Sequence, residues 1–286
     1  MIRPIERLLK SMGQHRRIVV LTGAGISARS GIPTYRDASG RWLRNQPIQH
    51  SEFVQSAHHR QRYWGRSMAG WPGVRDAQPS DLHLALTRLE ACGVVELIIT
   101  QNVDRLHQRA GSQRVIDLHG RLDRVLCLDC GAGYQRDEIQ QQLERRNPQH
   151  AYYSAQIQPD GDADLNDDQV AEIVVVDCAV CGGLLMPDVV FFGGSIPRSR
   201  VDTCQQAIDH ADALLVIGSS LQVYSGYRFC KQAYNLNLPV YIVNEGLTRA
   251  DDLATLKIND NALDHFVEAV DRLCEIYPQE ALCPTP

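Results

Sequence analysis

The sequence lacks long hydrophobic runs and lacks any excess of basic charge, and these two absences exclude different classes of protein. No apolar stretch approaches the roughly 20 residues that a membrane-spanning helix needs, so a membrane protein is not expected. Residues 1–10 carry scattered charges instead of a basic end followed by an apolar run, which argues against an export signal. The 29 basic and 34 acidic side chains give a formal net charge of -5, which provides no electrostatic footprint for nucleic acid.

The composition is that of an ordinary globular chain. Its 286 residues, 44% of them hydrophobic, can bury a substantial core as one large domain or as a domain with an inserted lobe. Nine cysteines are an odd number, and four of them form two Cys-x-x-Cys pairs, which indicates metal ligation rather than disulfides when no export signal is present. We therefore expect a cytoplasmic monomer without membrane association.

Short apolar runs alternate with helix-like segments, as a parallel sheet covered by helices requires. The predicted strands are Ile18–Leu21, Leu97–Thr100, Leu214–Ile217 and Val240–Val243, and the predicted helices between them include Leu82–Cys92 and Ser199–Ala211. Each strand ends in small or polar residues, at Thr22–Gly25, Thr100–Asn102, Gly218–Ser220 and Asn244–Gly246. Because ligands bind beyond the carboxyl ends of such strands, these four edges are predicted to meet at one crevice.

The pattern changes between about Asp123 and Met186, where no sheet alternation is clear. We interpret residues 123–185 as a small zinc-binding domain, and residues 1–122 with 186–286 as a large α/β domain of Rossmann type with a doubly wound parallel sheet. A helical insertion at about 43–87 is assigned to the small lobe. The acidic stretch Asp160–Asp164 lacks the glycine and glutamate of a calcium loop, and we interpret it as a solvated loop.

Four cysteines, Cys127, Cys130, Cys178 and Cys181, form the two tight pairs, and each pair is followed by glycine. Four thiolates in a tetrahedron suit zinc and leave no position open for water. We therefore predict one structural Zn²⁺ that holds the small lobe together. Unrelated buried cysteines or a redox pair remain the alternative. The other five cysteines are expected to be ordinary thiols.

A glycine turn follows the first strand, at Gly23-Ala24-Gly25-Ile26-Ser27. Such a turn brings backbone amides close to a pyrophosphate, so a dinucleotide is expected here. A dehydrogenase would have a third glycine where Ala28 stands and an acidic residue about 20 positions later, and neither is present. The polar loop Ser30–Asp37 follows, and is either a cover for the bound ligand or a surface connection.

Several motifs, in order over roughly residues 15–270, together resemble the sirtuins, and specifically the class II branch that includes a mitochondrial sirtuin of animals. The residues that carry the resemblance are Gly23–Ser27, Gly31–Pro33 with Tyr35 and Arg36, Thr100–His107, Leu118–Gly120, both cysteine pairs, Pro187–Gly193, Gly218–Val223 and Asn244.

The resemblance implies an NAD-dependent protein lysine deacylase whose cleft, between a large Rossmann-type domain and a zinc lobe, receives NAD and an acylated lysine. The cofactor-binding residues that it implies are Gly23, Ala24, Gly25, Ile26, Ser27, Tyr35, Arg36, Gln101, Asn102, Val103, Asp104, Gly218, Ser219, Ser220, Asn244, Glu245, Gly246 and Ala262. Val190 and Phe191 are implied to contact the substrate protein.

His119 matches the catalytic histidine of the family. An imidazole that is neutral at working pH can take a proton from a sugar hydroxyl. The resemblance implies that nicotinamide leaves, that His119 then assists attack by a ribose hydroxyl, and that free lysine and O-acyl-ADP-ribose result. His107, in a neighbouring motif, is expected to be structural.

Two departures from the family pattern stand in the cleft motifs: Thr34 replaces a common aspartate and Gly194 a common acidic residue. They bear on how the cofactor loop closes and how the peptide is gripped. Tyr63 and Arg66 have the Tyr-x-x-Arg spacing of sirtuins that act on dicarboxylic acyl groups, and such a pair shares one helix face. The arginine is either a carboxylate ligand in an acyl pocket or part of a solvated face.

Two other functions stay open from the sequence. Protein mono-ADP-ribosyl transfer uses the same activated ribose with a different acceptor. A catalytically silent NAD-sensing protein is less favoured because His119, Asn102 and Asp104 are all present. A dehydrogenase is disfavoured by its missing acidic residue.

Overall fold

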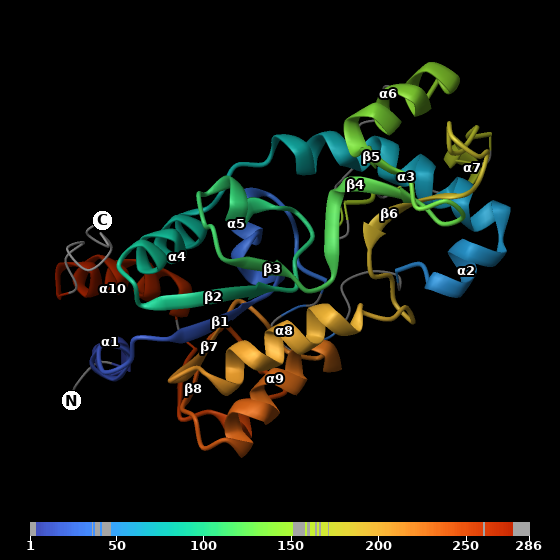
Figure 1. Ribbon diagram of the computed structural model, residues 1–286. Helices are drawn as coiled ribbons and strands as arrows, with labels where there is room; N and C mark the ends of the chain where they lie inside the picture. Colours follow the sequence, from blue (N-terminus) through green and yellow to red (C-terminus); the bar gives the residue numbers. More distant parts are fainter. Residues whose placement is uncertain are drawn as a thin grey trace, which may run out of the picture.

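The computed structural model describes residues 4–35, 37, 41, 47–150, 158, 161–163, 165, 167–170, 172–259 and 261–276. They form a large sheet domain and a smaller lobe (Figure 1). Among the helices in this part of the chain, none combines the length and the apolar character needed to cross a bilayer.

The large domain is built on a six-stranded parallel sheet in the order β3-β2-β1-β7-β8-β9. The strands span Ile18–Thr22 (β1), Val95–Thr100 (β2), Val115–Asp117 (β3), Ala213–Ile217 (β7), Val240–Val243 (β8) and Leu256–Ile258 (β9). Every residue of β1, β7 and β8 is buried, as expected for strands covered on both faces. All four predicted strands are therefore confirmed.

Helices cover both faces of this sheet (Figure 1). One layer contains α1 (Pro4–Met12), α4 (Asp81–Ala91) and α10 (Ala262–Ile276), and the other contains α8 (Arg198–Asp209) and α9 (Tyr224–Asn235). The short helix α5 (Leu106–Arg109) and the 3-10 turns Ala24–Ile26, Ala28–Ser30 and Asp251–Leu253 complete the domain. Leu82, Leu86 and Leu89 of α4 repeat at helical spacing and are fully buried in one core. The doubly wound Rossmann-type fold is confirmed.

The strand order places the crevice of the domain. The chain runs outward from β1 to β2 and β3, then returns to β7 on the other side of β1. In doubly wound sheets the ligand crevice lies at this reversal, beyond the carboxyl ends of the two central strands. β1 ends at Thr22 and β7 at Ile217, so the glycine loops that begin at Gly23 and Gly218 emerge side by side.

The small lobe holds a three-stranded antiparallel sheet in the order β5-β4-β6. Its strands are β4 (Gly120–Cys127), β5 (Gly133–Gln135) and β6 (Leu185–Val189), and its helices are α2 (His50–Gln55), α3 (Ala57–Asp76), α6 (Arg136–Arg146) and α7 (Asp167–Val170). Phe53, Trp64, Leu143 and Leu185 share one buried cluster, which joins these helices to the sheet. α2 and α3 thus pack in the small lobe, whereas α4, from Asp81, packs on the large sheet.

In the small lobe, one sheet was not predicted and one expectation is wrong. The segment that follows Asp123 contains most of β4. This strand pairs with β6 about 60 residues later in the chain, and a pairing over that distance leaves no local pattern in the sequence. The acidic stretch is not a solvated loop where it is described, because Gly161 and Ala163 are buried and the Ala163 N–H donates to the carbonyl of Arg66 at 3.0 Å. A Cβ on Gly70 would lie 2.3 Å from the Gly161 carbonyl oxygen, so α3 and this stretch meet backbone to backbone.

Candidate functional site

Two glycine loops form the floor of the crevice. The Gly25 N–H donates to the Gly218 carbonyl at 2.8 Å. A Cβ on Gly23 would lie 2.8 Å from Ser219 Cβ, and a Cβ on Gly25 would lie 2.8 Å from Gly218 Cα. Gly218 itself has φ of 61°, a conformation that favours glycine. The loops therefore need glycine for their own contact, and this contact leaves bare backbone facing the crevice.

A buried polar cluster holds the first loop in place. Asn102 Nδ2 donates to the Gly23 carbonyl at 3.0 Å and to Ser27 Oγ at 2.9 Å. Ser27 Oγ donates to Asp104 at 2.7 Å, and the Leu106 N–H donates to the other oxygen of the same carboxylate. Burial raises the pKa of Asp104, and these two hydrogen bonds oppose the rise. Asp104 thus supports the loop from behind.

Gln101 connects the two loops. Its side-chain amide donates to the Thr22 carbonyl at 3.1 Å and to Ser219 Oγ at 2.8 Å. Gly226, in the first turn of α9, approaches so closely that a Cβ there would lie 2.6 Å from Gln101 Oε1. The start of α9 is therefore fixed against the end of β2.

A cavity of about 810 Å³ opens above these loops and extends to the small lobe. Fifteen of the residues predicted for the site line it: Gly23, Ala24, Gly25, Tyr35, Gln101, Asn102, Val103, His119, Val190, Phe191, Gly218, Ser219, Ser220, Asn244 and Glu245. Thr34 and Gly194, the two departures from the family pattern, line it as well.

Other predicted residues lie away from the cavity wall. Ile26, Ser27, Asp104, Gly246, Ala262, Tyr63 and Arg66 are outside its lining, and Arg36 lies outside the described residues. Ala262 is fully buried in the core between α10 and the sheet. His107, expected to be structural, is buried with its Nε2 2.9 Å from Thr22 Oγ1.

Phe192, from the motif Pro187–Gly193, lines the cavity too, and so do residues that were not predicted from the sequence, among them Ile196, Val201, Ser225 and Arg228. Ser225 and Arg228 lie three residues apart at the start of α9, shortly after the glycine loop at Gly218. Their helical spacing after a predicted site loop was the available signal.

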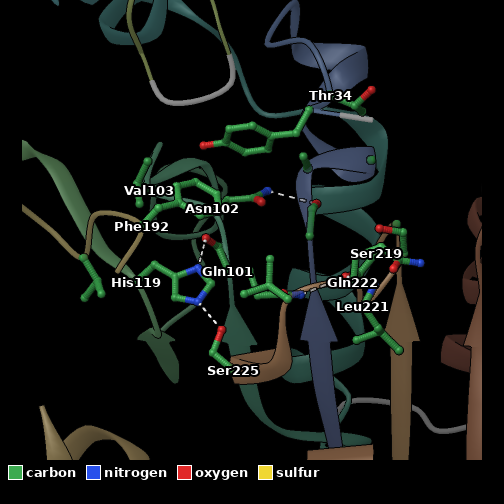
Figure 2. Close-up of a pocket in the computed structure, with 18 of the residues that line it drawn as sticks. Thr34, Gln101, Asn102, Val103, His119, Phe192, Ser219, Leu221, Gln222 and Ser225 are labelled. Atoms are coloured by element: carbon green, nitrogen blue, oxygen red, sulfur yellow. Dashed lines mark hydrogen bonds between the residues drawn. The ribbon is translucent and has the colours of Figure 1, made fainter. Parts of the chain in front are cut away.

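His119 lies at the start of the small-lobe sheet, between Gln101 and Ser225 (Figure 2). Its Nδ1 is 3.0 Å from the Gln101 carbonyl oxygen and its Nε2 is 2.7 Å from Ser225 Oγ. A carbonyl oxygen only accepts, so Nδ1 carries the proton and donates, and Nε2 accepts from the serine hydroxyl. The backbone of His119 is also held, since its carbonyl accepts from the Val190 N–H at 2.8 Å.

The electrostatic surroundings keep His119 neutral. Burial lowers the pKa of its imidazole to about 4, the hydrogen bond to Gln101 opposes this shift, and Arg200 and Arg228 add to it. His119 lines the cavity. At neutral pH the site therefore offers an uncharged imidazole that can accept a proton.

Tyr63 and Arg66, the pair with the Tyr-x-x-Arg spacing, lie on α3 behind the residues that line the cavity. The Tyr63 ring is buried and packs 5.2 Å, centroid to centroid, from the ring of Phe191, which does line the cavity. Arg66 is half-buried, and its carbonyl receives the hydrogen bond from the buried stretch at Ala163.

The four predicted zinc ligands come together at one end of the small lobe. Their sulfur atoms all lie within 4.8 Å of one another, with Cys127 and Cys181 at 3.5 Å and Cys130 and Cys178 at 3.7 Å. A tetrahedron with Zn–S bonds of about 2.3 Å has edges of about 3.8 Å, so these spacings fit zinc. The donor set leaves no position for water, and the cluster is compatible with a structural zinc.

Glycines shape both halves of the cysteine cluster. Gly131, with φ of 74°, donates to the Cys127 carbonyl, and Gly182, with φ of 72°, donates to the Cys178 carbonyl. The left-handed backbone at these positions turns each pair of cysteines toward the common centre. Tyr134 Oη lies 3.0 Å from Cys178 Sγ, as an outer contact to one ligand.

Comparison with known proteins agrees with this architecture. The Sir2 family model matches residues 23–225. A relative from Bradyrhizobium diazoefficiens named NAD-dependent protein deacetylase 2 is 51% identical over 255 residues, which cover 89% of this chain and 93% of the relative. The human protein named NAD-dependent protein lipoamidase sirtuin-4, mitochondrial, is 47% identical over 258 residues, which cover 89% of this chain and 82% of the human protein.

Solved structures show the same fold. A Sir2 protein bound to acetylated peptide aligns with a TM-score of 0.74 at 30% identity, covering 95% of this chain and 98% of its own. A Sir2 homologue in complex with ADP-ribose aligns with a TM-score of 0.76 at 28% identity, covering 98% and 99%.

The two lobes, the crevice and the four-cysteine cluster thus define a sirtuin, and the chain belongs to the Sir2 family. The identity with human sirtuin-4 confirms the resemblance to the class II branch.

Proposed function

We propose that this chain is an NAD-dependent protein lysine deacylase, which releases nicotinamide and transfers the acyl group of a modified lysine to ADP-ribose. The observation that carries the proposal is a neutral imidazole, His119, in one cavity with two bare glycine loops. The bacterial and human relatives, which are named for NAD-dependent deacetylase and lipoamidase activities, support it.

The residues on the cavity wall divide the work. When bound, NAD supplies a ribose carbon that becomes reactive as its bond to nicotinamide breaks. Gly23, Gly25 and Gly218 expose backbone that suits the pyrophosphate, and Asn244 with Glu245 line the end assigned to the adenosine half. Asn102 and Gln101 fix these loops, and His119 Nε2 is the base for the proton that a ribose hydroxyl loses. Supporting roles are assigned to Ser27 and Asp104.

The acylated lysine is assigned to the end of the cavity lined by Val190 and Phe191. Tyr63 reaches this end through its ring contact with Phe191. We retain the proposal that Arg66 reads a terminal carboxylate, which requires its guanidinium to turn toward the cavity. Arg66→Met is then expected to lose desuccinylation and keep deacetylation, whereas equal loss of both activities would end this idea.

The test is incubation of the zinc-loaded protein with NAD and a panel of acetyl-, lipoyl- and succinyl-lysine peptides. We expect mass spectrometry to show the free peptide together with O-acyl-ADP-ribose. A peptide that gains ADP-ribose would support the alternative, mono-ADP-ribosyl transfer. If no peptide in the panel caused nicotinamide to be released, the proposal would be contradicted. Formation of NADH would support a dehydrogenase.

Cytoplasmic location and a monomeric state belong to the same proposal. The four-thiolate cluster supports the location, because such a site needs cysteines kept reduced. Cell fractionation tests the location, and light scattering after size-exclusion chromatography tests the monomer. A stable dimer would contradict the second part.

A further inference from the structure

We propose that Ser225 is the proton relay of this site: the proton of the attacking ribose hydroxyl passes to Ser225 Oγ while the serine's own proton passes to His119 Nε2. The inference rests on the proposed function and adds a residue to its proton path. The observation behind it is the hydrogen bond of 2.7 Å between Ser225 Oγ and His119 Nε2 (Figure 2).

The hydrogen bonds of the imidazole assign the donors. Nδ1 donates to the Gln101 carbonyl, so the lone pair of the ring is on Nε2. Ser225 donates to that lone pair. Both ring nitrogens are thus engaged within the protein, and Ser225 Oγ covers the one atom that can accept a proton. No residue in the described part of the chain donates to Ser225 Oγ, so a lone pair there can accept a hydrogen bond from a sugar hydroxyl.

The position of Ser225 is fixed by its neighbours. Gly226, the next residue, is pressed against the Gln101 side chain, and a Cβ there would lie 2.6 Å from Oε1. The backbone carbonyl of the same glutamine holds His119 Nδ1. Gln101 therefore fixes both groups: its side chain contacts the residue after Ser225, and its backbone carbonyl accepts from His119. Ser225 is only 9% exposed, and both side chains line the cavity.

The step balances in atoms and electrons. At this stage the acyl oxygen has bonded to the ribose carbon that released nicotinamide, and the acyl carbon has a double bond to the lysine nitrogen. The ribose O–H bond breaks as its oxygen bonds to the acyl carbon, and the π bond between that carbon and the lysine nitrogen opens onto the nitrogen. Ser225 Oγ takes the ribose proton, and the hydroxyl proton of Ser225 moves to Nε2. Serine ends neutral, and His119 ends as an imidazolium that still donates through Nδ1. Because the surroundings disfavour the charged ring, this imidazolium readily gives its proton to the departing lysine amine.

The experiment compares Ser225→Ala and Ser225→Thr with the natural enzyme, using an acetyl-lysine peptide and NAD. Exchange of labelled nicotinamide reports the first bond cleavage, and O-acyl-ADP-ribose reports the step that needs the relay. We expect Ser225→Ala to lose about 100-fold in acyl transfer, with exchange changed less than about twofold. Ser225→Thr, which keeps the hydroxyl, restores most of the acyl transfer. Tyr224→Phe, an exposed neighbour on α9, serves as the matched control and changes neither rate.

A second measurement does not depend on turnover. In ¹⁵N NMR spectra of the protein without NAD, we expect His119 to carry its proton on Nδ1 and to show a hydrogen-bonded Nε2. In Ser225→Ala the Nε2 signal should move toward that of an unbonded nitrogen, and the imidazole pKa should rise because the hydroxyl donor is lost. An unchanged Nε2 signal would overturn the pairing.

The outcomes separate the relay from the proposed function. Acyl transfer by Ser225→Ala that is unchanged or faster would overturn the relay, and so would a parallel fall in exchange. If the natural enzyme released no nicotinamide, the proposed function would be overturned instead. The NMR measurement would still test the hydrogen bond between Ser225 Oγ and His119 Nε2.

Discussion

The two lobes of the molecule build their sites in opposite ways. In the large domain, the crevice floor is backbone pressed against backbone, with Gly25 and Gly218 in direct contact. In the small lobe, Cys127 and its three partner cysteines surround a position that fits a metal. The glycines of the crevice floor therefore have no room for a Cβ, whereas the cysteine cluster depends on an ion from outside the chain. This contrast predicts which changes each lobe withstands.

The largest expected effect is loss of the metal. Cys127→Ser should remove bound zinc and loosen the small lobe, because apparent zinc binding energies of about 10–16 kcal/mol also support folding. Zinc content and tryptophan fluorescence, to which buried Trp64 contributes, measure this. Deacylation should fall more than about 100-fold, while the helical signal of the large domain persists. Cys92→Ser, a half-buried thiol outside the cluster, is the control. Full zinc content in Cys127→Ser would contradict the account.

The next effect concerns the crevice floor. Gly25→Ala places a Cβ 2.8 Å from backbone atoms of Gly218, which cannot turn away. ADP-ribose binding by calorimetry should weaken more than about tenfold, a loss of about 1.4 kcal/mol or more, with zinc content unchanged. The small-lobe control is Gly133→Ala, where the nearest atom, at 3.2 Å, is the tip of the Arg124 side chain. Equal effects of the two substitutions would break the comparison.

The third effect is on the acid stability that a buried histidine of the large domain controls. Burial lowers the pKa of His83, in the large-domain helix α4, to about 4. The unfolded chain then binds more protons between about pH 4 and 6.5, so the free energy of unfolding rises with pH across that window. One such histidine contributes up to about 1.4 kcal/mol per pH unit. Urea unfolding at pH 5 and pH 7 measures this.

His83→Gln sharpens that measurement. His83 Nδ1 accepts the Ser80 N–H at 3.1 Å as part of a helix cap, and glutamine offers an oxygen for the same role. The variant should keep its stability at pH 7 and show a shallower loss toward pH 5. An unaltered slope would show that the acid sensitivity arises elsewhere.

The smallest expected effect is on the outer contact of the metal site. Tyr134→Phe removes the hydroxyl 3.0 Å from Cys178 Sγ and should weaken zinc affinity about tenfold. Zinc transfer to a coloured chelator follows this. Tyr234→Phe, an exposed tyrosine of the large domain, should leave the transfer rate unchanged. Identical rates for the natural protein and Tyr134→Phe would show that the Tyr134 hydroxyl does not contribute to zinc affinity.

The sequence predicted the parts that local chemistry determines. Gly23, Gly25 and Gly218 follow buried strands, and their requirement for glycine arises within the loops themselves. The cysteine pairs could be predicted for the same reason, since the glycine after each pair donates a hydrogen bond back to the first cysteine of that pair. The resemblance to sirtuins then supplied His119, which composition and spacing alone would have left structural.

The parts that depend on distant contacts were not predictable. Ser225 reaches His119 only because α9 packs against Gln101, at a separation of more than 100 residues in the chain. β4 and β6 pair across the whole zinc-lobe insertion, so neither showed as part of a sheet. Asp104 was expected to bind the cofactor, and the sequence did not predict that its carboxylate accepts from Ser27 Oγ behind the first glycine loop, a contact set by tertiary packing.

The most direct test of the central claim is to compare two rates in His119→Ala, namely exchange of labelled nicotinamide into NAD and formation of O-acyl-ADP-ribose from an acetyl-lysine peptide. We expect exchange to persist while the acylated product falls at least about 100-fold, because only the second step needs a proton acceptor at Nε2. Product formation at the natural rate, with zinc content and folding intact, would contradict the central claim.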